Sequence, residues 1–481
     1  MAKTRSGNRR GALKEGRLAS SFRDPSGFLF YEKGELYRFI APVYQEHFDH
    51  LMSSGLYEAL VRENLLLPHE EVRETPRRLQ GAYKILKPRM IPFISYPYEW
   101  CFSQFKAAAL CTLAVQKIAL RFGMTLKDAS CYNIQFFEGK AIFIDTLSFD
   151  LYKEGMPWVA YGQFCRHFLA PLALMSERDA RLSQLMRVFI DGIPLDLASS
   201  LLPFSSNFKP SLLSHLRLHA AFQKRYEKGI EKKKTPRLSQ ARLIALLESL
   251  KDAVEGLKLN SKRSEWGEYY EETNYSHRAF QAKKDFVKAV LEKTSPETVW
   301  DLGANTGVFS RIASGNGIFT VAFDVDHETV EKNWQEVRLR KETNLLPLLM
   351  DFTNPSSSLG WAGEERMSLA ERGPADMVLA LALLHHLAIS NNVPFGKIAK
   401  FFSRICSVLV IEFVPKEDSN AQKLLRSRDD IFPFYTKEHF ENAFSQFFRI
   451  IRQEQVVDSR RTLYLMKKYE SRTRFLNNTS Q

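Results

Sequence analysis

Short apolar runs alternate with amphipathic stretches through the C-terminal half of the chain, from residue 264 to 470. Seven runs rich in Val, Ile, Leu and Phe are typical of buried strands: Thr298–Leu302, Phe319–Val325, Leu345–Met350, Asp376–Ala382, Val408–Phe413, Phe448–Val456 and Thr462–Lys467. Between them, helical spacing appears in Val308–Ala313, Glu328–Arg340, Pro394–Ser403 and Lys437–Phe447. Alternating strands and helices predict an α/β domain with a doubly wound, seven-stranded, largely parallel sheet. The last two runs leave no room for a crossover helix, which predicts a hairpin and an antiparallel strand.

The N-terminal half has a mixed pattern between residues 21 and 204. Residues 26–40 (SGFLFYEKGELYRFI) predict a β-hairpin that turns at Glu32-Lys33-Gly34. Helical spacing follows in Val43–Ala59 and Phe102–Phe122, and a strand is expected at Ala141–Ile144. These elements predict an α+β domain.

A change of composition separates the two halves at residues 205–263. This segment holds a basic run, Pro236 and a helical pattern from Leu238 to Leu257, and is interpreted as a linker with a connecting helix. We therefore expect five parts: a basic disordered tail (1–20), the α+β domain (21–204), the linker (205–263), the α/β domain (264–470) and a C-terminal tail (471–481).

The charge of the chain is concentrated in two short segments. Of the net charge of +13, residues 1–18 and 224–237 together carry 10, so the two domains are nearly balanced. Basic runs of this kind are usually solvated tails and linkers. The alternative is that they contact the phosphates of an RNA.

Composition argues against several other classes. With 44% hydrophobic and 26% charged residues the chain resembles an ordinary globular protein, and no apolar run reaches membrane-spanning length. No apolar segment follows the basic N-terminus, as a secretory signal would require. The five cysteines are an odd number without C-x-x-C spacing, which argues against a zinc site and a disulfide framework. We expect a cytoplasmic protein with no metal and no membrane partner.

The candidate chemistry lies at the first strand of the α/β domain. This strand runs into Asp301-Leu-Gly303-Ala-Asn305-Thr-Gly307, and a helix follows directly. Glycines at such a turn let the backbone approach a ligand closely. The spacing is not the G-x-G-x-x-G of dinucleotide sites, which makes a NAD site the weaker interpretation. Asp324, at the end of the second strand, suits a bond to ribose hydroxyls. The alternative is a plain α/β turn.

In these segments the chain resembles class I S-adenosylmethionine-dependent methyltransferases, which have a Rossmann-like fold. VWDLGANTGVFS is similar to the first motif of that family, VAFDVD to its ribose-binding acid, LLMDF to its adenine-flanking segment and DMVLALALLHHL to its fourth motif. A more distant similarity, to nodulation-type methyltransferases, lies in WGEYYEETNYSHRAF. The resemblance implies the cofactor S-adenosylmethionine. It also implies contacts to its methionine moiety (Asp301, Gly303, Asn305, Gly307), its ribose (Asp324), its adenine (Asp351, Phe352) and its other side (Leu381 to His385).

Methyl transfer from a sulfonium needs mainly alignment, and a base only where the acceptor must lose a proton. His385 and His386 are the leading candidates for that base, and Glu412 is the next. An alternative for the histidines is a structural hydrogen bond, and another for the whole site is a regulatory cofactor site without catalysis. The chain lacks the N/D-P-P-Y and Pro-Cys motifs of nucleobase methylation, which disfavours that substrate class. A small molecule, a glycan or a protein all remain possible acceptors. Tyr269, Tyr270 and Tyr275 are interpreted equally well as a lid or as core aromatics.

In the N-terminal half, Asp128, Asn133 and Asp145 have a spacing that resembles the catalytic loop and metal-binding Asp of protein-kinase-like folds. The resemblance implies that Asp128 orients an acceptor hydroxyl and that the other two hold magnesium on a nucleotide. Several features of that family are missing. There is no Gly-rich loop and no V-A-I-K lysine, for which Arg38, Lys84 or Lys87 are the candidate replacements. The favoured interpretation is therefore a domain that recruits or orients the methyl acceptor. The alternatives are a bifunctional enzyme that also transfers phosphate and a local turn in which Asp128 and Asn133 cap the backbone.

Overall fold

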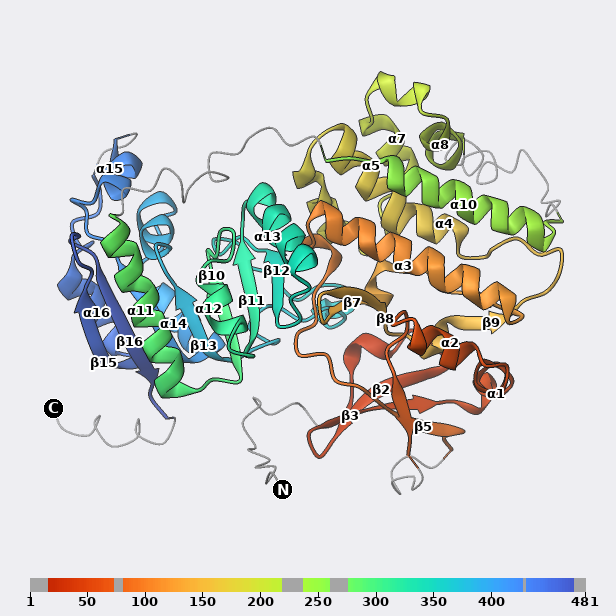
Figure 1. The fold of residues 1–481 in the computed structure, drawn as a ribbon, viewed down its shortest axis with the longest axis horizontal. Coiled ribbons are helices and arrows are strands. Elements are labelled where there is room, and N and C mark those ends of the chain that lie inside the picture. The colour runs from red at the N-terminus through yellow and green to blue at the C-terminus, as the bar shows by residue number, and fades with distance from the viewer. Residues whose placement is uncertain (1–15, 73–80, 219–236, 260–275, 427–429, 471–481) are drawn as a thin grey trace. The chain divides into compact units, whose positions relative to one another are not determined.

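The computed structural model describes residues 16–72, 81–218, 237–259, 276–426 and 430–470. The chain divides into two compact units (Figure 1). The N-terminal unit consists of Met1–Lys262 together with Ser358–Arg366, and the C-terminal unit of Arg263–Ser357 together with Met367–Gln481. The segments expected as a basic tail, most of the basic run, the tyrosines at 269, 270 and 275, and the C-terminal tail lie wholly or largely outside the described residues.

The C-terminal unit is built on a seven-stranded sheet, as expected. In the sheet the strands follow the order β12 (Leu345–Leu349), β11 (Phe319–Asp324), β10 (Thr298–Leu302), β13 (Ala375–Ala380), β14 (Cys406–Phe413), β16 (Thr462–Lys468) and β15 (Phe448–Gln455). The five strands from β12 to β14 are parallel. Strand β16 pairs antiparallel with β14 and with β15, which confirms the expected hairpin. This mixed α/β architecture is the predicted doubly wound fold.

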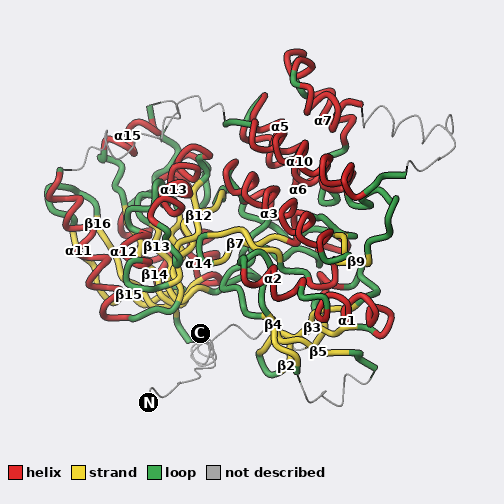
Figure 2. Tube along the Cα trace, turned by 45° about the vertical axis from the view of Figure 1, so that its right-hand side comes forward, coloured by secondary structure: helices red, strands yellow, loops and turns green. Residues whose placement is uncertain are grey.

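Helices cover both faces of this sheet, which is why its strands are apolar on both sides. One face packs against α11 (His277–Thr294) and α12 (Ser310–Ser314), in a core that includes alternate residues of β13 and β16. On the other face, Phe440 of α16 (Lys437–Ser445) lies against Tyr464 of β16, with ring centroids 5.1 Å apart. Helix α14 (Phe395–Ile405) packs on α16, and the remaining helices are α13 (His327–Arg340) and α15 (Ser419–Leu425). Figure 2 shows the strands gathered between these helices.

The N-terminal unit begins with a five-stranded antiparallel sheet. Its order is β1 (Gly16–Arg17), β2 (Gly27–Glu32), β3 (Glu35–Ile40), β5 (Lys84–Pro88) and β4 (His69–Glu71), and β2 and β3 form the predicted hairpin. Two further strand pairs are β6 (Met124–Leu126) with β9 (Phe149–Leu151) and β7 (Ile134–Phe137) with β8 (Lys140–Phe143). The helices are α1 (Gln45–Ser53), α2 (Leu56–Arg62), α3 (Phe102–Arg121), α4 (Tyr161–Phe164), α5 (Ala170–Glu177), α6 (Leu185–Val188), α7 (Leu195–Leu201), α8 (Pro210–Leu212) and α10 (Gln240–Gly256). The unit is therefore α+β.

Two helical expectations for this unit need correction. The helix expected over Val43–Ala59 is two helices, because Gly55 takes a left-handed conformation with φ of +85° between α1 and α2. The expected connecting helix is α10, which belongs to the N-terminal unit and lies beside α3 (Figure 1). Its buried face carries Leu243, Leu247, Leu250 and Val254. An amphipathic face of this width is buried where a neighbouring helix is available, so α10 is packed structure and not a linker.

A short hairpin of the N-terminal unit comes from far along the sequence. Residues 358–366 lie in the sequence between β12 and β13, and a bridge between Leu359 and Arg366 closes the hairpin. Glu365 is 4% exposed, receives hydrogen bonds from the guanidinium of Arg23 at 2.6 and 3.1 Å, and accepts the N–H of Trp361 at 2.9 Å. The guanidinium of Arg366 stacks 3.8 Å from the ring centroid of Tyr132. These contacts explain why the segment belongs to the N-terminal unit.

No helix in the described part of the chain is both long and apolar enough to cross a membrane.

Gly360 in this hairpin offers a stability test with a matched control. Gly360 and Gly34 both have positive φ, of +86° and +78°. A Cβ on Gly360 would lie 2.6 Å from Cβ of Glu365, whereas one on Gly34 meets nothing within 4 Å. We expect Gly34→Ala to cost about 1 kcal/mol, from the backbone alone. Gly360→Ala should cost at least about 2 kcal/mol, because an overpacking term is added. Denaturant unfolding of the full chain measures both, and equal costs would contradict the hairpin packing.

Candidate functional site

In the C-terminal sheet, successive strands are added first on one side of β10 and then on its other side. Strands β11 and β12 lie on one side of β10, and β13 and β14 lie on the other. In an open parallel sheet a ligand binds beyond the carboxyl ends of the strands at such a switch point. The segments that follow β10 and β13 meet there, and they are the two segments that carry most of the candidate residues.

The glycine turn after β10 is held in a shape that few residues tolerate. Gly303, Asn305 and Gly307 have φ values of +77°, +50° and +82°. The N–H groups of Gly303 and Ala304 both donate to the carbonyl of Phe323, at 2.9 Å. A Cβ at Gly307 would lie 2.6 Å from Nδ2 of Asn333, so this position has no room for a side chain. At Gly303 a Cβ would only touch Leu383, at 3.6 Å, which leaves the surface of the turn open to a ligand.

Asp301 lies beneath the turn. Its carboxylate is 2% exposed and accepts the hydroxyl of Ser310 at 2.6 Å. Burial, with the nearby charge of Asp324, raises the pKa of Asp301 to about 7. The residue thus joins the end of β10 to the start of α12 and supports the turn from below.

Asp324 joins the ends of β10 and β11. Its Oδ2 accepts the N–H of Asn305 at 2.8 Å, and its Oδ1 accepts the N–H of Asp326 at 3.0 Å. Burial raises the pKa of Asp324, and the two backbone bonds oppose that shift. The carboxylate therefore lies beside the glycine turn, where the sequence placed a ribose contact.

Asp351 and Phe352 follow β12 at the same edge. The N–H of Met350 donates to the carbonyl of Asp324 at 2.8 Å, which brings this segment next to β11. Asp351 is exposed and accepts the N–H and the hydroxyl of Thr353, at 2.8 and 2.6 Å. The ring of Phe352 stands nearly perpendicular to that of Phe323, 5.9 Å away. The three strand ends β10, β11 and β12 thus present the predicted cofactor residues in one row.

The segment after β13 differs from expectation at Leu381. Its side chain belongs to the core under α11 and α12 instead of lying beside the turn, because it continues the inward alternation of Met377 and Leu379. The residue that approaches Gly303 is Leu383. Leu383 lies within the expected segment Leu381 to His385, and continuing the alternation past the strand end distinguishes it from Leu381.

The two histidines lie one after the other in this segment, with ring centroids 4.2 Å apart. His385 is 1% exposed, and neither of its ring nitrogens has a hydrogen-bond partner among the described residues. Burial is the main cause that holds the pKa of His385 well below its usual value, and His386, Arg461 and Lys283 add to the shift. Burial and Arg461 lower the pKa of His386 to about 4. Both imidazoles are therefore neutral at neutral pH.

Glu412, the third candidate base, is fully buried at the end of β14. Its Oε2 accepts a bond from Nζ of Lys283 and one from the N–H of Ala382, both at 2.8 Å. Its Oε1 lies 3.8 Å from the guanidinium of Arg461. A carboxylate engaged in this way is poorly suited to take a proton from an acceptor, and the geometry favours a structural role.

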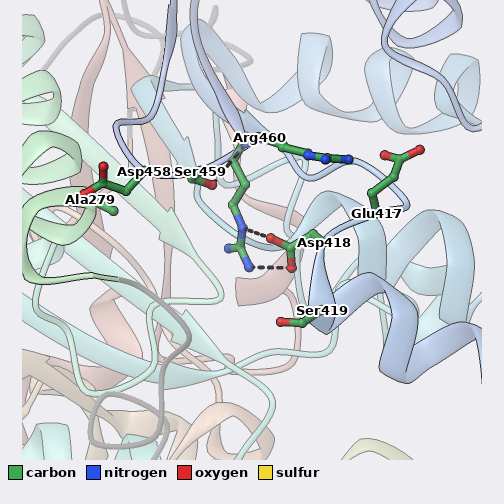
Figure 3. A pocket seen from close by; sticks show the side chains of 8 residues that line it. Ala279, Glu417, Asp418, Ser419, Asp458, Ser459 and Arg460 are labelled. Atoms are coloured by element: carbon green, nitrogen blue, oxygen red, sulfur yellow. Dashed lines mark hydrogen bonds and ion pairs between the residues drawn. The ribbon is translucent and has the colours of Figure 1, made fainter.

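A cavity of about 500 Å³ opens at the same edge, beyond β14 and β16 (Figure 3). Its lining comes from the start of α11, the loop after β14 and the turn between β15 and β16: Ala279, Glu417, Asp418, Ser419, Asp458, Ser459, Arg460 and Arg461. The lining is strongly polar. No local sequence pattern marks this cavity, because its walls come from three segments far apart in the chain.

The N-terminal candidates Asp128, Asn133 and Asp145 are brought together. Asp145 forms an ion pair with Arg38 of β3 and accepts a hydrogen bond from the hydroxyl of Ser148. The oxygen of that hydroxyl accepts a hydrogen bond from Nδ2 of Asn133, at 3.1 Å. Although burial opposes ionisation, Arg38 and these bonds lower the pKa of Asp145. Burial and the charge of Asp145 raise the pKa of Asp128.

Of the three candidate replacements for the missing lysine, only Arg38 reaches this group. Lys84 and Lys87 form ion pairs on the sheet instead, with Glu71 and Glu35. Across the described ranges, no three His, Cys, Asp or Glu side chains are grouped as a metal site would need.

Asp301 makes the stability of the C-terminal unit depend on pH. Its folded pKa of about 7 exceeds the value of roughly 3.9 for an unfolded Asp, so the unfolded chain loses this proton first. The free energy of unfolding should therefore fall as pH rises from about 4 to about 7, and level off above. We expect Asp301→Asn to flatten this slope in urea unfolding measured across that window. An unchanged slope would show that Asp301 ionises normally.

Known proteins similar to this chain include a relative that matches nearly its full length. No model of a protein family matches the chain. Two solved structures with similarity to part of the chain are magnesium protoporphyrin IX methyltransferase (ChlM) from Synechocystis PCC 6803 and the bifunctional kinase-methyltransferase WbdD. The first is 17% identical, covers 42% of this chain and 93% of its own, and gives a TM-score of 0.31. The second is 15% identical, covers 42% of this chain and 41% of its own, and gives a TM-score of 0.29.

The relative is the nodulation protein NoeA of Rhizobium meliloti (strain 1021). It is 34% identical over 467 residues, which span 95% of this chain and 98% of NoeA. The match therefore extends over both units. With identity at this level along nearly the full length of both chains, the protein belongs to the family of nodulation protein NoeA.

Proposed function

We propose that the protein is an S-adenosylmethionine-dependent methyltransferase, with its cofactor along the carboxyl edge of β10, β11 and β12. The observation that supports this most is the open glycine turn at the switch point, braced by Asp324. The residues fit the cofactor: the turn leaves space above Gly303, and beside it lies the Asp324 carboxylate, which is only partly buried. When bound, the cofactor supplies a methyl group already activated by the sulfonium.

In this proposal each group of residues serves a different moiety of the cofactor. Gly303, Asn305 and Gly307 shape the surface for the methionine moiety, with Asp301 supporting them from below. Asp324 accepts the ribose hydroxyls, and Phe352 with Asp351 borders the adenine. Within the segment Leu381 to His385, Leu383 is the residue that borders the other side of the cofactor.

His385 is the proposed base for an acceptor that must lose a proton. It is neutral, buried and without a hydrogen-bond partner among the described residues, so a hydroxyl or amine of an acceptor would satisfy it. His386 is the alternative. The acceptor itself is a small molecule, a glycan or a protein, which the N-terminal unit recruits or orients. An RNA acceptor remains the alternative that would use the basic segments.

A Gly303→Arg variant tests the cofactor site. The side chain would fill the open surface of the turn, so we expect micromolar binding of S-adenosylmethionine in the wild type and none in the variant. Calorimetric titration of the full chains measures this. His385→Ala is the matched control, expected to bind the cofactor like the wild type while losing slow turnover to S-adenosylhomocysteine. A wild type that does not bind would refute the proposal, and equal turnover in His385→Ala would refute the base.

The grouping of Asp128, Asn133 and Asp145 with Arg38 favours a second candidate function, nucleotide binding by the N-terminal unit. Ser148 links Asn133 to Asp145, and Arg38 keeps Asp145 ionised, as a magnesium ligand must be. The engagement of Asp145 by Arg38 is equally compatible with a structural ion pair, so binding must decide.

We expect Asp145→Ala to abolish any magnesium-dependent ATP binding by the full chain, because it removes the proposed metal ligand. The control is Asp150→Ala, which removes a half-exposed carboxylate from the same region. Titration of ATP with and without magnesium measures both, and melting temperatures verify that the variants are folded. Absence of binding by the wild type would leave the unit with the recruiting role.

A further inference from the structure

Four charged side chains, three of them buried, form a network in the C-terminal unit. Lys283 of α11 and Glu412 of β14 are 2% and 0% exposed and form an ion pair with 2.8 Å between Nζ and Oε2. Arg461 is 1% exposed and binds both carboxylate oxygens of Asp418, at 2.6 and 2.8 Å. Its guanidinium also lies 3.8 Å from Glu412. Lys283, Glu412 and Arg461 are thus almost fully removed from water, while Asp418 stays 10% exposed.

Stability alone explains this network poorly. Each buried ion loses several kcal/mol of hydration, and apolar residues of similar volume often do as well or better. A buried ion pair is therefore weak support for stability. A backbone contact made by Glu412 shows what else the network does.

That contact is the N–H of Ala382, which donates to Oε2 of Glu412 at 2.8 Å. Ala382 has φ of +52°, a left-handed conformation that a residue with a Cβ adopts only when its surroundings enforce it. It lies two residues beyond the end of β13 and begins the segment that carries Leu383 to Gly303 and His385 to its buried position. Glu412 therefore fixes the residue at which this segment leaves the strand.

The network also extends to the polar cavity. Asp418 and Arg461 belong to its lining, and the hydrogen bonds at Asp418 are drawn in Figure 3. The same connected charges thus reach from the cavity to the segment beside the glycine turn.

We propose that Glu412 and Lys283 are positioning residues that hold residues 382–386 against the glycine turn by fixing the left-handed Ala382. This inference rests on the proposed function, because the turn is the cofactor site of that proposal. Lys283 keeps Glu412 ionised and in place, and Glu412 acts through the Ala382 N–H. Neither residue touches the cofactor in this arrangement.

The first test is Glu412→Gln. The amide keeps the shape but weakens the bond to Ala382 and removes the charge with which Lys283 forms its ion pair. We expect S-adenosylmethionine to bind about tenfold more weakly in calorimetry, the size expected when a hydrogen bond to a charged group is lost. We also expect faster amide exchange confined to residues 381–387. Asp430→Asn is the control, because it removes a carboxylate that pairs with Lys416 at the surface, 2.8 Å away.

A second variant separates positioning from folding. In Lys283→Met with Glu412→Leu the ion pair is replaced by apolar side chains, which buried positions often accept without loss of stability. We expect a melting temperature near that of the wild type, together with faster exchange at 381–387 and weaker cofactor binding. Wild-type exchange and affinity in this folded double variant would overturn the proposal.

The two proposals fail in different ways. The exchange measurement needs no cofactor. A wild type that does not bind S-adenosylmethionine would therefore refute the proposed function, while the exchange of residues 381–387 would still decide whether Glu412 holds Ala382.

Discussion

Strand β10 is hydrogen-bonded in parallel to β11 on one side and to β13 on the other. Strand β12 is added beyond β11, and β14 is added beyond β13, so the sheet grows outward from β10 on both sides. Parallel strands end at the same edge, so the segments after β10, β11, β12 and β13 all converge there. The glycine turn, Asp324, Phe352 and Leu383 owe their proximity to this pairing. The turn itself is local, but what lies around it is set by strand order.

Buried carboxylates shape the local structure in both units. Asp145 is paired with Arg38 in the N-terminal unit, and Glu412 with Lys283 in the C-terminal one. In each case the carboxylate also binds neighbouring groups, Ser148 in one and the Ala382 N–H in the other. A charge removed from water must be satisfied on several sides, which makes such residues strong constraints on nearby backbone. His385 and His386 differ from these carboxylates, because burial lowers the pKa of both imidazoles and keeps them neutral.

The hairpin 358–366 shows that the path of the chain and the division into compact units do not coincide. It lies in the sequence between two strands of the C-terminal sheet, yet its contacts are with Arg23 and Tyr132. The backbone of Gly360 and the bonds of Glu365 make it an ordered element. Of the residues involved, only Gly360 indicates a turn from the sequence alone. Because glycines are common in loops, it does not distinguish this hairpin from an ordinary loop.

The seven strands, their alternation with helices and the glycine turn were predictable from the sequence, because period, length and turn residues are local properties. The sequence also indicated Asp324 and the segments at 351–352 and 381–386, through motifs tied to strand ends. Tertiary structure decided what those residues touch. In the folded protein Leu381 lies in the core and Leu383 lies next to Gly303. Glu412 pairs with Lys283 of α11, which is 129 residues away in the sequence. Tertiary structure also packed α10 on α3 and assembled the polar cavity from three distant segments. These outcomes depend on partners brought together by folding, and a pattern of neighbouring residues does not contain them.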